Sequence, residues 1–175
     1  MNRSRIRRIA GNGIMGALLV VLQVGLSSIP NTELVTPVLI CYAIVFGSEA
    51  YAASLVFAFL EILVWGLGLW NIMYIYIWPL LVLLTLGLKA IIPENLIDRT
   101  SGQLLFGLLA GVYGLCFGAL CTIVYIVVSP ATAFAWWVAG IKTDIWHGFC
   151  NLTLTIIVYR PVINIMRRVK LRERS

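Results

Sequence analysis

The sequence has 175 residues, of which 61% are hydrophobic and 11% are charged, and its mean hydropathy is +0.98. These values exclude an ordinary soluble domain and indicate that most of the chain lies in lipid. The net charge of +6 could indicate a nucleic-acid partner, but the basic residues lie at the chain ends and in one set of loops rather than on a folded basic module. Because a membrane-spanning helix needs about 20 apolar residues, the chain has room for about six of them and for no sizeable soluble domain.

Apolar segments separated by turn residues follow one another along the chain. They predict helices over residues 13–29, 34–46, 50–67, 72–88, 104–128 and 144–166. Residues 89–103 form the one clearly polar internal loop, and residues 131–142 are expected to be apolar but irregular. The predicted fold is therefore an all-α integral membrane protein, a single domain of residues 1–175 built as a bundle of six transmembrane helices.

The basic residues test this segmentation, because cytoplasmic loops of membrane proteins retain Lys and Arg. All but one of the 13 fall on one side of the predicted bundle, namely Arg3, Arg5, Arg7, Arg8, Lys89, Arg99, Arg160, Arg167, Arg168, Lys170, Arg172 and Arg174. Only Lys142 falls on the other side. An even number of spans with both termini in the cytoplasm accounts for this distribution.

Glu61 lies within the third predicted helix, where an ionised carboxylate costs several kcal/mol unless it faces a cavity or a partner. One interpretation makes it a ligand contact or a proton site, with Trp65 one turn further along the same face. The other pairs it with an internal hydroxyl group or leaves it protonated within the packing.

Asp144, His147 and Asn151 are spaced so that they share one stripe of the sixth predicted helix, near its outer end. Three hydrogen-bonding side chains on one stripe predict a polar binding wall. The alternatives are a histidine that is satisfied within the packing and an aspartate that favours the first turn of its helix.

Aromatic side chains gather in the outer connections around the polar stripe. They include Trp65, Trp70, Tyr74, Tyr76, Trp78, Trp136, Trp137 and Trp146, with Asn71 among them. An interfacial belt would account for part of this set. Small-molecule pockets also combine aromatic walls with a few placed polar groups, and aromatic faces suit a flat heterocycle.

No catalytic motif is evident in the sequence. It contains no Gly-x-Ser-Gly nucleophile, no His-Glu-x-x-His zinc motif and no phosphate-binding glycine loop, and its four cysteines form no Cys-x-x-Cys pair. We therefore expect a protein that is not an enzyme, with no catalytic residue, no metal site and no cofactor in this chain. If transport is powered by ATP, the ATPase must be another chain.

Small residues recur along two of the predicted helices. Gly13 and Ala17 begin the first one, where they would let another helix approach closely. Four glycines follow one face of the fifth predicted helix and are expected to serve internal packing, namely Gly107, Gly111, Gly114 and Gly118.

Two stretches carry a resemblance to a known family. Residues 29–36 read Ile-Pro-Asn-Thr-Glu-Leu-Val-Thr, and residues 140–151 read Gly-Ile-Lys-Thr-Asp-Ile-Trp-His-Gly-Phe-Cys-Asn, with Tyr159-Arg160-Pro161 further on. Together with the length, the six segments and the basic ends, they resemble the substrate-binding S-component of energy-coupling factor (ECF) vitamin transporters. The second stretch is similar to the Asp-x-x-His-x-x-x-Asn pattern of several S-components.

The resemblance implies a multi-pass protein of a bacterial cell membrane that captures a water-soluble vitamin or precursor beneath its outer loops. It would act with a transmembrane coupling subunit and two cytoplasmic ATPase subunits, which use the ATP, and would topple in the membrane to release its cargo. Gly13 and Ala17 stand where these proteins carry an Ala-x-x-x-Ala docking motif. The expected substrate contacts are Glu61, Trp70, Asn71, Asp144, His147 and Asn151.

The short loops and the aromatic wall favour a compact heteroaromatic cargo that is pyridoxine-like or hydroxymethylpyrimidine-like, with pantothenate and cobalamin still open. One alternative function is an autonomous proton-coupled carrier or small channel that uses Glu61 and His147 as its relay. A second is an assembly subunit that binds no ligand.

Overall fold

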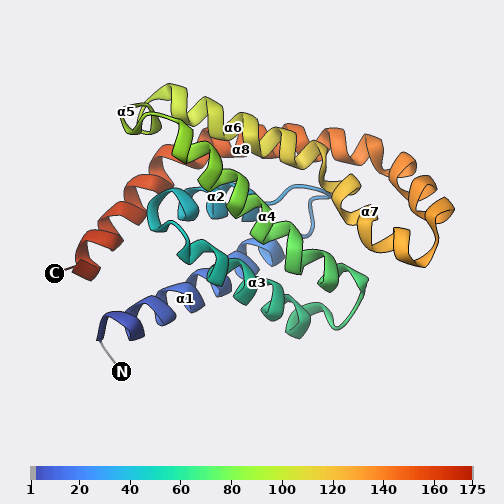
Figure 1. Cartoon of the computed structure of the whole chain (residues 1–175), viewed down its shortest axis with the longest axis horizontal. Coiled ribbons are helices and arrows are strands. Elements are labelled where there is room, and N and C mark those ends of the chain that lie inside the picture. The colour runs from blue at the N-terminus through green and yellow to red at the C-terminus, as the bar shows by residue number, and fades with distance from the viewer. Residues whose placement is uncertain (1–2, 175) are drawn as a thin grey trace.

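The computed structural model describes residues 3–174 of the chain, so residues 1, 2 and 175 of the predicted domain lie outside the described part. The described residues form helices joined by short turns, as the all-α prediction requires (Figure 1). The helices are α1 (Arg3–Leu26), α2 (Val35–Phe46), α3 (Glu49–Trp65), α4 (Leu69–Ile91), α5 (Glu94–Ile97), α6 (Thr100–Leu115), α7 (Phe117–Val128) and α8 (Pro130–Arg174).

Four stretches of helix are long and apolar enough to cross a membrane: Arg5–Leu26, Leu69–Ile91, Thr100–Val127 and Pro130–Arg172. By their length and composition, these helices are compatible with a membrane protein. The α2 and α3 helices, of 12 and 17 residues, are shorter. At about 1.5 Å per residue, α2 covers only about 18 Å, less than the apolar thickness of a bilayer.

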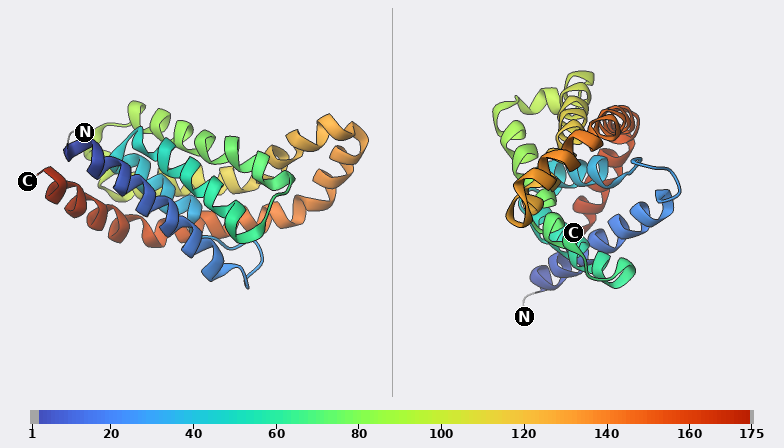
Figure 2. Two further views of the ribbon diagram at one scale, coloured as in Figure 1. Left: turned by 90° about the horizontal axis from the view of Figure 1, so that it is seen from below. Right: turned by 90° about the vertical axis from the view of Figure 1, so that its right-hand side faces the viewer.

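The helices run back and forth along the long axis of the molecule (Figures 1 and 2). The N-terminal end of α1, the C-terminal end of α8, the α2–α3 turn and α5 lie at one end, which we call the basic end. The α1–α2 loop, the α3–α4 turn and the α7–α8 junction lie at the other.

Polar contacts of basic side chains tie the helices together at the basic end. Arg8 pairs with Glu49 at 2.9 Å, which joins α1 to α3, and Arg167 of α8 pairs with Asp98 at 2.7 Å. The C-terminal carbonyls of α2 accept hydrogen bonds from two lysines, Lys89 of α4 and Lys170 of α8. Positive charge at a helix C-terminus is favourable because the last carbonyl groups there have no partner within the helix.

The short helix α2 forms the centre of the bundle. Residues 35–45 are all buried, and α2 packs against α1, α3, α4, α6 and α8. Its sequence is apolar on every face, which fits a helix surrounded by others rather than one with a lipid or water side. Because protein surrounds it, α2 does not have to match the thickness of the membrane.

Glycines allow α6 and α8 to pack at very close range, as predicted for the fifth segment. A Cβ atom on Gly114 would lie 2.8 Å from the Cα atom of Gly148, and one on Gly107 would lie 2.8 Å from the side chain of Ile156. The contact at Gly114 is with backbone and leaves no room for a larger residue, so the spacing of the two helices depends on this glycine.

Two segments differ from the sequence prediction. Residues 131–142 are helical and form the first part of α8, so the expectation of an irregular stretch was wrong. Pro130 begins the helix at a position where a missing N–H costs nothing, and Ser129 Oγ accepts the Thr132 backbone N–H at 3.4 Å. The predicted helix 104–128 is divided at Cys116 into α6 and α7, and α7 turns away from the line of α6 (Figure 1).

The bounds of other predicted helices differ as well, and the helix predicted over residues 144–166 continues to Arg174. The first helix begins well before the predicted residue 13 and ends at Leu26, so residues 27–29 belong to the loop instead. The polar segment 89–103 is shorter than predicted, because α4 continues to Ile91, α6 begins at Thr100 and α5 lies between them.

Candidate functional site

Three adjoining hollows lie at the end of the bundle away from the chain termini, and Tyr74 lines all of them. We call them together the end cavity. The first, of 230 Å³, lies beneath the α1–α2 loop, and the second, of 530 Å³, lies between α4, α7 and α8. The third, of 420 Å³, lies where α1, α3 and α4 meet. Their sizes suit a small organic molecule.

The α1–α2 loop, residues 27–34, lies over the first hollow. Its backbone turns at Asn31, which adopts a positive φ of 51°, a conformation that asparagine tolerates better than most residues. Thr32 Oγ1 lies 3.6 Å from Cys150 Sγ of α8, so the loop is tied to a helix far away in the sequence. The loop therefore forms a positioned cover.

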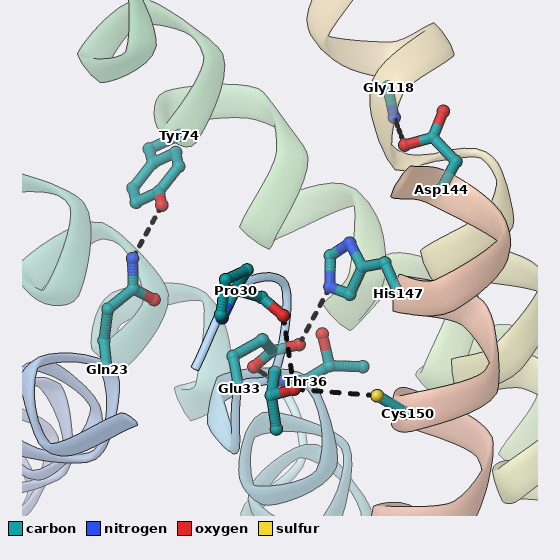
Figure 3. Close-up of polar contacts among 10 residues, drawn as sticks. Gln23, Pro30, Glu33, Thr36, Tyr74, Gly118, Asp144, His147 and Cys150 are labelled. Atoms are coloured by element: carbon teal, nitrogen blue, oxygen red, sulfur yellow. Dashed lines mark hydrogen bonds and ion pairs between the residues drawn. The ribbon is translucent and has the colours of Figure 1, made fainter. Parts of the chain in front are cut away.

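Glu33 makes the second tie between the loop and α8. Its Oε1 atom lies 3.5 Å from Nε2 of His147, and its Oε2 atom accepts a 2.7 Å hydrogen bond from the Thr36 backbone N–H in the first turn of α2 (Figure 3). The His147 ring meets Phe117 edge-on at 4.8 Å between centroids. One carboxylate thus positions the loop, the start of α2 and the imidazole.

Asp144 lines the second hollow from α8. Its Oδ1 atom accepts a 3.1 Å hydrogen bond from the Gly118 backbone N–H, whereas its Oδ2 atom is buried without a hydrogen bond from any described residue. A Cβ atom on Gly118 would overlap Asp144 Oδ2, so a larger residue there would displace the carboxylate. The Asp144 side chain therefore presents one unsatisfied oxygen beside the hollow.

Glu61 lines the third hollow and is 1% exposed. Neither of its oxygens has a well-aligned hydrogen bond within the described part of the chain, and the Trp65 indole one turn along α3 provides only a weak one. Nearby, Gln23 Nε2 donates a 2.8 Å hydrogen bond to the Tyr74 hydroxyl. Glu61 is therefore the least satisfied carboxylate of the end cavity.

Aromatic rings connect the three hollows. Trp70, Tyr74 and Trp78 stand one turn apart on α4, and each meets the next edge-on at 5.4 Å between centroids. Trp78 then meets Phe117 of α7 at 6.0 Å. The row leads from the Glu61 hollow to the His147 hollow and forms a continuous aromatic wall.

Four of the six predicted contact residues line the end cavity: Glu61, Trp70, Asp144 and His147. Asn71 does not line any of the three hollows; its Oδ1 atom accepts a 2.6 Å hydrogen bond from the Gly68 backbone N–H and closes the α3–α4 turn. Asn151 is fully buried one turn beyond His147, also outside the lining, and neither of its polar atoms is hydrogen-bonded within residues 3–174.

Sequence reasoning missed Glu33, Gln23 and Phe117 as lining residues. A signal for Glu33 was present, because a carboxylate three residues before Thr36 and just ahead of an apolar run is typical of a helix start. The sequence signal for Gln23 was weaker, because it consists only of a single amide side chain near the outer end of an apolar segment. Nothing in the sequence indicated that either of them faces α8 or α4.

The small residues of α1 face two different directions. Gly16 is buried, and a Cβ atom there would lie 2.8 Å from Val56 Cβ and 3.1 Å from the Phe57 backbone nitrogen of α3. A Cβ atom on Gly13 would meet nothing within 4 Å, and Ala17 is exposed. Gly16 thus serves packing inside the chain, whereas the predicted docking pair leaves an open face.

Comparison with known proteins adds no relative. No protein-family model matches the sequence, and no curated protein or solved structure is detectably similar to it. The function is therefore inferred from the residues and the geometry of the end cavity.

Proposed function

We propose that this chain is the substrate-binding S-component of an ECF-type importer that captures a compact, water-soluble heteroaromatic vitamin or precursor. The observation that carries the proposal is the end cavity, where an aromatic wall and buried polar groups lie beneath a loop tied down by Glu33 and His147. An apolar wall with a few placed polar groups is the usual composition of a small-molecule site.

The distribution of charge supports a six-span topology with both termini in the cytoplasm. The described Lys and Arg side chains Arg8, Lys89, Arg167 and Lys170 make their contacts at the basic end, and Lys and Arg are retained on the cytoplasmic side. In this orientation, the end cavity faces the outside, where cargo is captured. The short α2 is compatible with a sixth span because it is enclosed by the bundle.

The open face of α1 supports docking to a coupling subunit. A Cβ atom on Gly13 would meet nothing within 4 Å, unlike one on Gly16, and Ala17 is exposed, so another helix can approach the backbone there. In the proposed complex, two cytoplasmic ATPases bind and hydrolyse ATP, and this chain supplies recognition.

Reconstitution tests the proposal. The purified chain is examined by mass spectrometry for retained vitamins, and then placed in liposomes with or without a coupling subunit and ATPases. We expect tight binding by the chain alone and uptake only when the partners and ATP are present. Flux that follows a pH gradient without ATP would instead support the autonomous carrier, and a chain that binds no vitamin would support an assembly subunit.

A further inference from the structure

The end cavity brings together three carboxylates from three separate elements. Glu33 comes from the α1–α2 loop, Glu61 from α3 and Asp144 from α8. Each keeps at least one oxygen that is buried without a well-aligned hydrogen bond from the described residues. The site therefore holds more acceptors than the surrounding residues satisfy.

Basic groups that could balance these acids are scarce at this end of the molecule. Among residues 3–174, no lysine or arginine lines any of the three hollows, and His147 is the one basic side chain in the lining. The sequence contains no lysine or arginine between residues 9 and 88, and only Lys142 between residues 100 and 159. Lys142 is exposed and lies outside the lining.

The three carboxylates differ in how far they are satisfied. Glu33 has His147 and the Thr36 backbone N–H, and Asp144 has the Gly118 backbone N–H. Glu61, which is 1% exposed, has within the described structure only the weak contact of the Trp65 indole. A buried carboxylate with no base and no backbone donor needs an external partner more than the other two do.

The rings beside Glu61 favour the same kind of partner. Trp65, Trp70 and Tyr74 line the third hollow together with it. The face of an aromatic ring carries negative electrostatic potential and attracts a cation, most strongly when both are removed from water. The Glu61 carboxylate and the aromatic faces of this hollow thus both favour a cation.

We propose that the end cavity binds a planar heterocyclic cation, with a quaternary or protonated nitrogen, and that Glu61 is its principal counter-ion. This inference rests on the proposed function, because it names the chemical class of the cargo. An anionic cargo would need lysine or arginine in the lining to pair with its carboxylate or phosphate. The described residues that line the end cavity include neither.

A competition experiment on the purified chain in lipid nanodiscs tests the proposal. The probes are matched in shape and differ in charge: 1-methylnicotinamide, nicotinamide and nicotinate form one set, and pyridoxamine and pyridoxine form another, with thiamine as a larger cation. The compounds are offered in equimolar amounts, and those retained are identified by mass spectrometry. We expect the cations to be retained in preference to their neutral and anionic counterparts.

The Glu61→Gln variant assigns the counter-ion. Gln preserves the shape of the side chain and removes its charge, so we expect affinity for the retained cation to fall about tenfold or more. The Glu49→Gln variant is the matched control, because Glu49 pairs with Arg8 at the basic end and should leave binding unchanged. Equal affinity of Glu61→Gln and wild type would refute the role of Glu61.

The competition among the probes uses the wild-type chain, so its result does not depend on whether the Glu61→Gln variant folds. Preference for a neutral or anionic probe would refute the proposal that the cargo is a cation, but it would leave the S-component proposal in place. The chain could also retain none of the probes and still support uptake of another vitamin that depends on the ATPase partners. That result too would refute only the proposal of a cationic cargo. Failure of both binding and partner-dependent uptake overturns the proposed function itself.

Discussion

Glu33 Oε1 lies 3.5 Å from His147 Nε2, while Glu33 Oε2 accepts a 2.7 Å hydrogen bond from the Thr36 backbone N–H. The same carboxylate therefore connects the α1–α2 loop, the first turn of α2 and the middle of α8. Because the pair stands in the wall of the first hollow, any change that separates the two side chains also loosens the cover of the end cavity.

A double-mutant cycle measures this connection. Glu33→Gln keeps an acceptor for the Thr36 N–H but removes the charge, and His147→Gln removes the imidazole. We expect each change to lower the stability of the purified chain, and the pair to show a coupling free energy of about 0.5–3 kcal/mol, as residues in contact do. Thermal unfolding in detergent gives the four values, and strictly additive effects would show that the two side chains do not interact.

Close packing of α6 on α8 predicts a strong effect of one added methyl group. Gly114→Ala would place its Cβ atom 2.8 Å from Gly148 Cα, and backbone cannot move aside cheaply. We expect a destabilisation of about 1–3 kcal/mol, the usual cost of overpacking. Thermal unfolding is the measurement.

Gly87→Ala is the control for that change. A Cβ atom at Gly87 meets nothing within 4 Å. Since glycine within a helix costs roughly 0.5–1 kcal/mol relative to alanine, we expect this variant to be equally or more stable than wild type. Equal destabilisation by both substitutions would contradict the close contact between α6 and α8.

The open face of α1 predicts a variant that separates binding from transport. The double substitution Gly13→Leu and Ala17→Leu should leave ligand binding by the isolated chain intact, because neither position packs inside the bundle. It should abolish association with the coupling subunit, because the bulky side chains keep a partner helix at a distance. Copurification with the partner subunits and ATP-dependent uptake are the two readouts.

Gly25→Leu is the matched control on the same helix. Gly25 is exposed and has open space around it, but it lies near the opposite end of α1. Wild-type uptake by this variant, together with loss of uptake in the double variant, assigns the docking face. Normal uptake by the double variant would place the docking surface elsewhere.

Tyr74 is the residue shared by all three hollows, so its ring should matter more than its hydroxyl group. Tyr74→Phe removes the hydrogen bond with Gln23 and should weaken ligand affinity by about 1 kcal/mol. Tyr74→Ala also removes the ring, and we expect a loss of about 3 kcal/mol or more. Trp137→Ala, at an exposed ring outside the lining, should have little effect. If only Trp137→Ala caused a large loss of ligand affinity, the binding site would lie outside the end cavity.

The sequence by itself determined the class of the fold and the direction of several faces. Its apolar segments are long enough to require helices in lipid, and the predicted helix 34–46 coincides almost completely with α2. The spacing of Asp144 and His147 places them on one stripe of α8 whatever surrounds it. Helical periodicity is a local property, so it can be read without knowledge of the neighbours.

Only the tertiary structure decided what those faces meet. In the sequence Glu33 is a single acidic residue in a turn, and only the path of the loop places it beside His147. Asn151 shares the stripe of His147 but is fully buried and lies outside the hollows. Asn71 has a polar side chain of the kind that contacts ligands, but its amide oxygen instead closes the α3–α4 turn. Contacts between distant segments depend on how close the helices come, and here that distance is set by glycines such as Gly114 and Gly148, whose effect appears only when α6 and α8 are packed together.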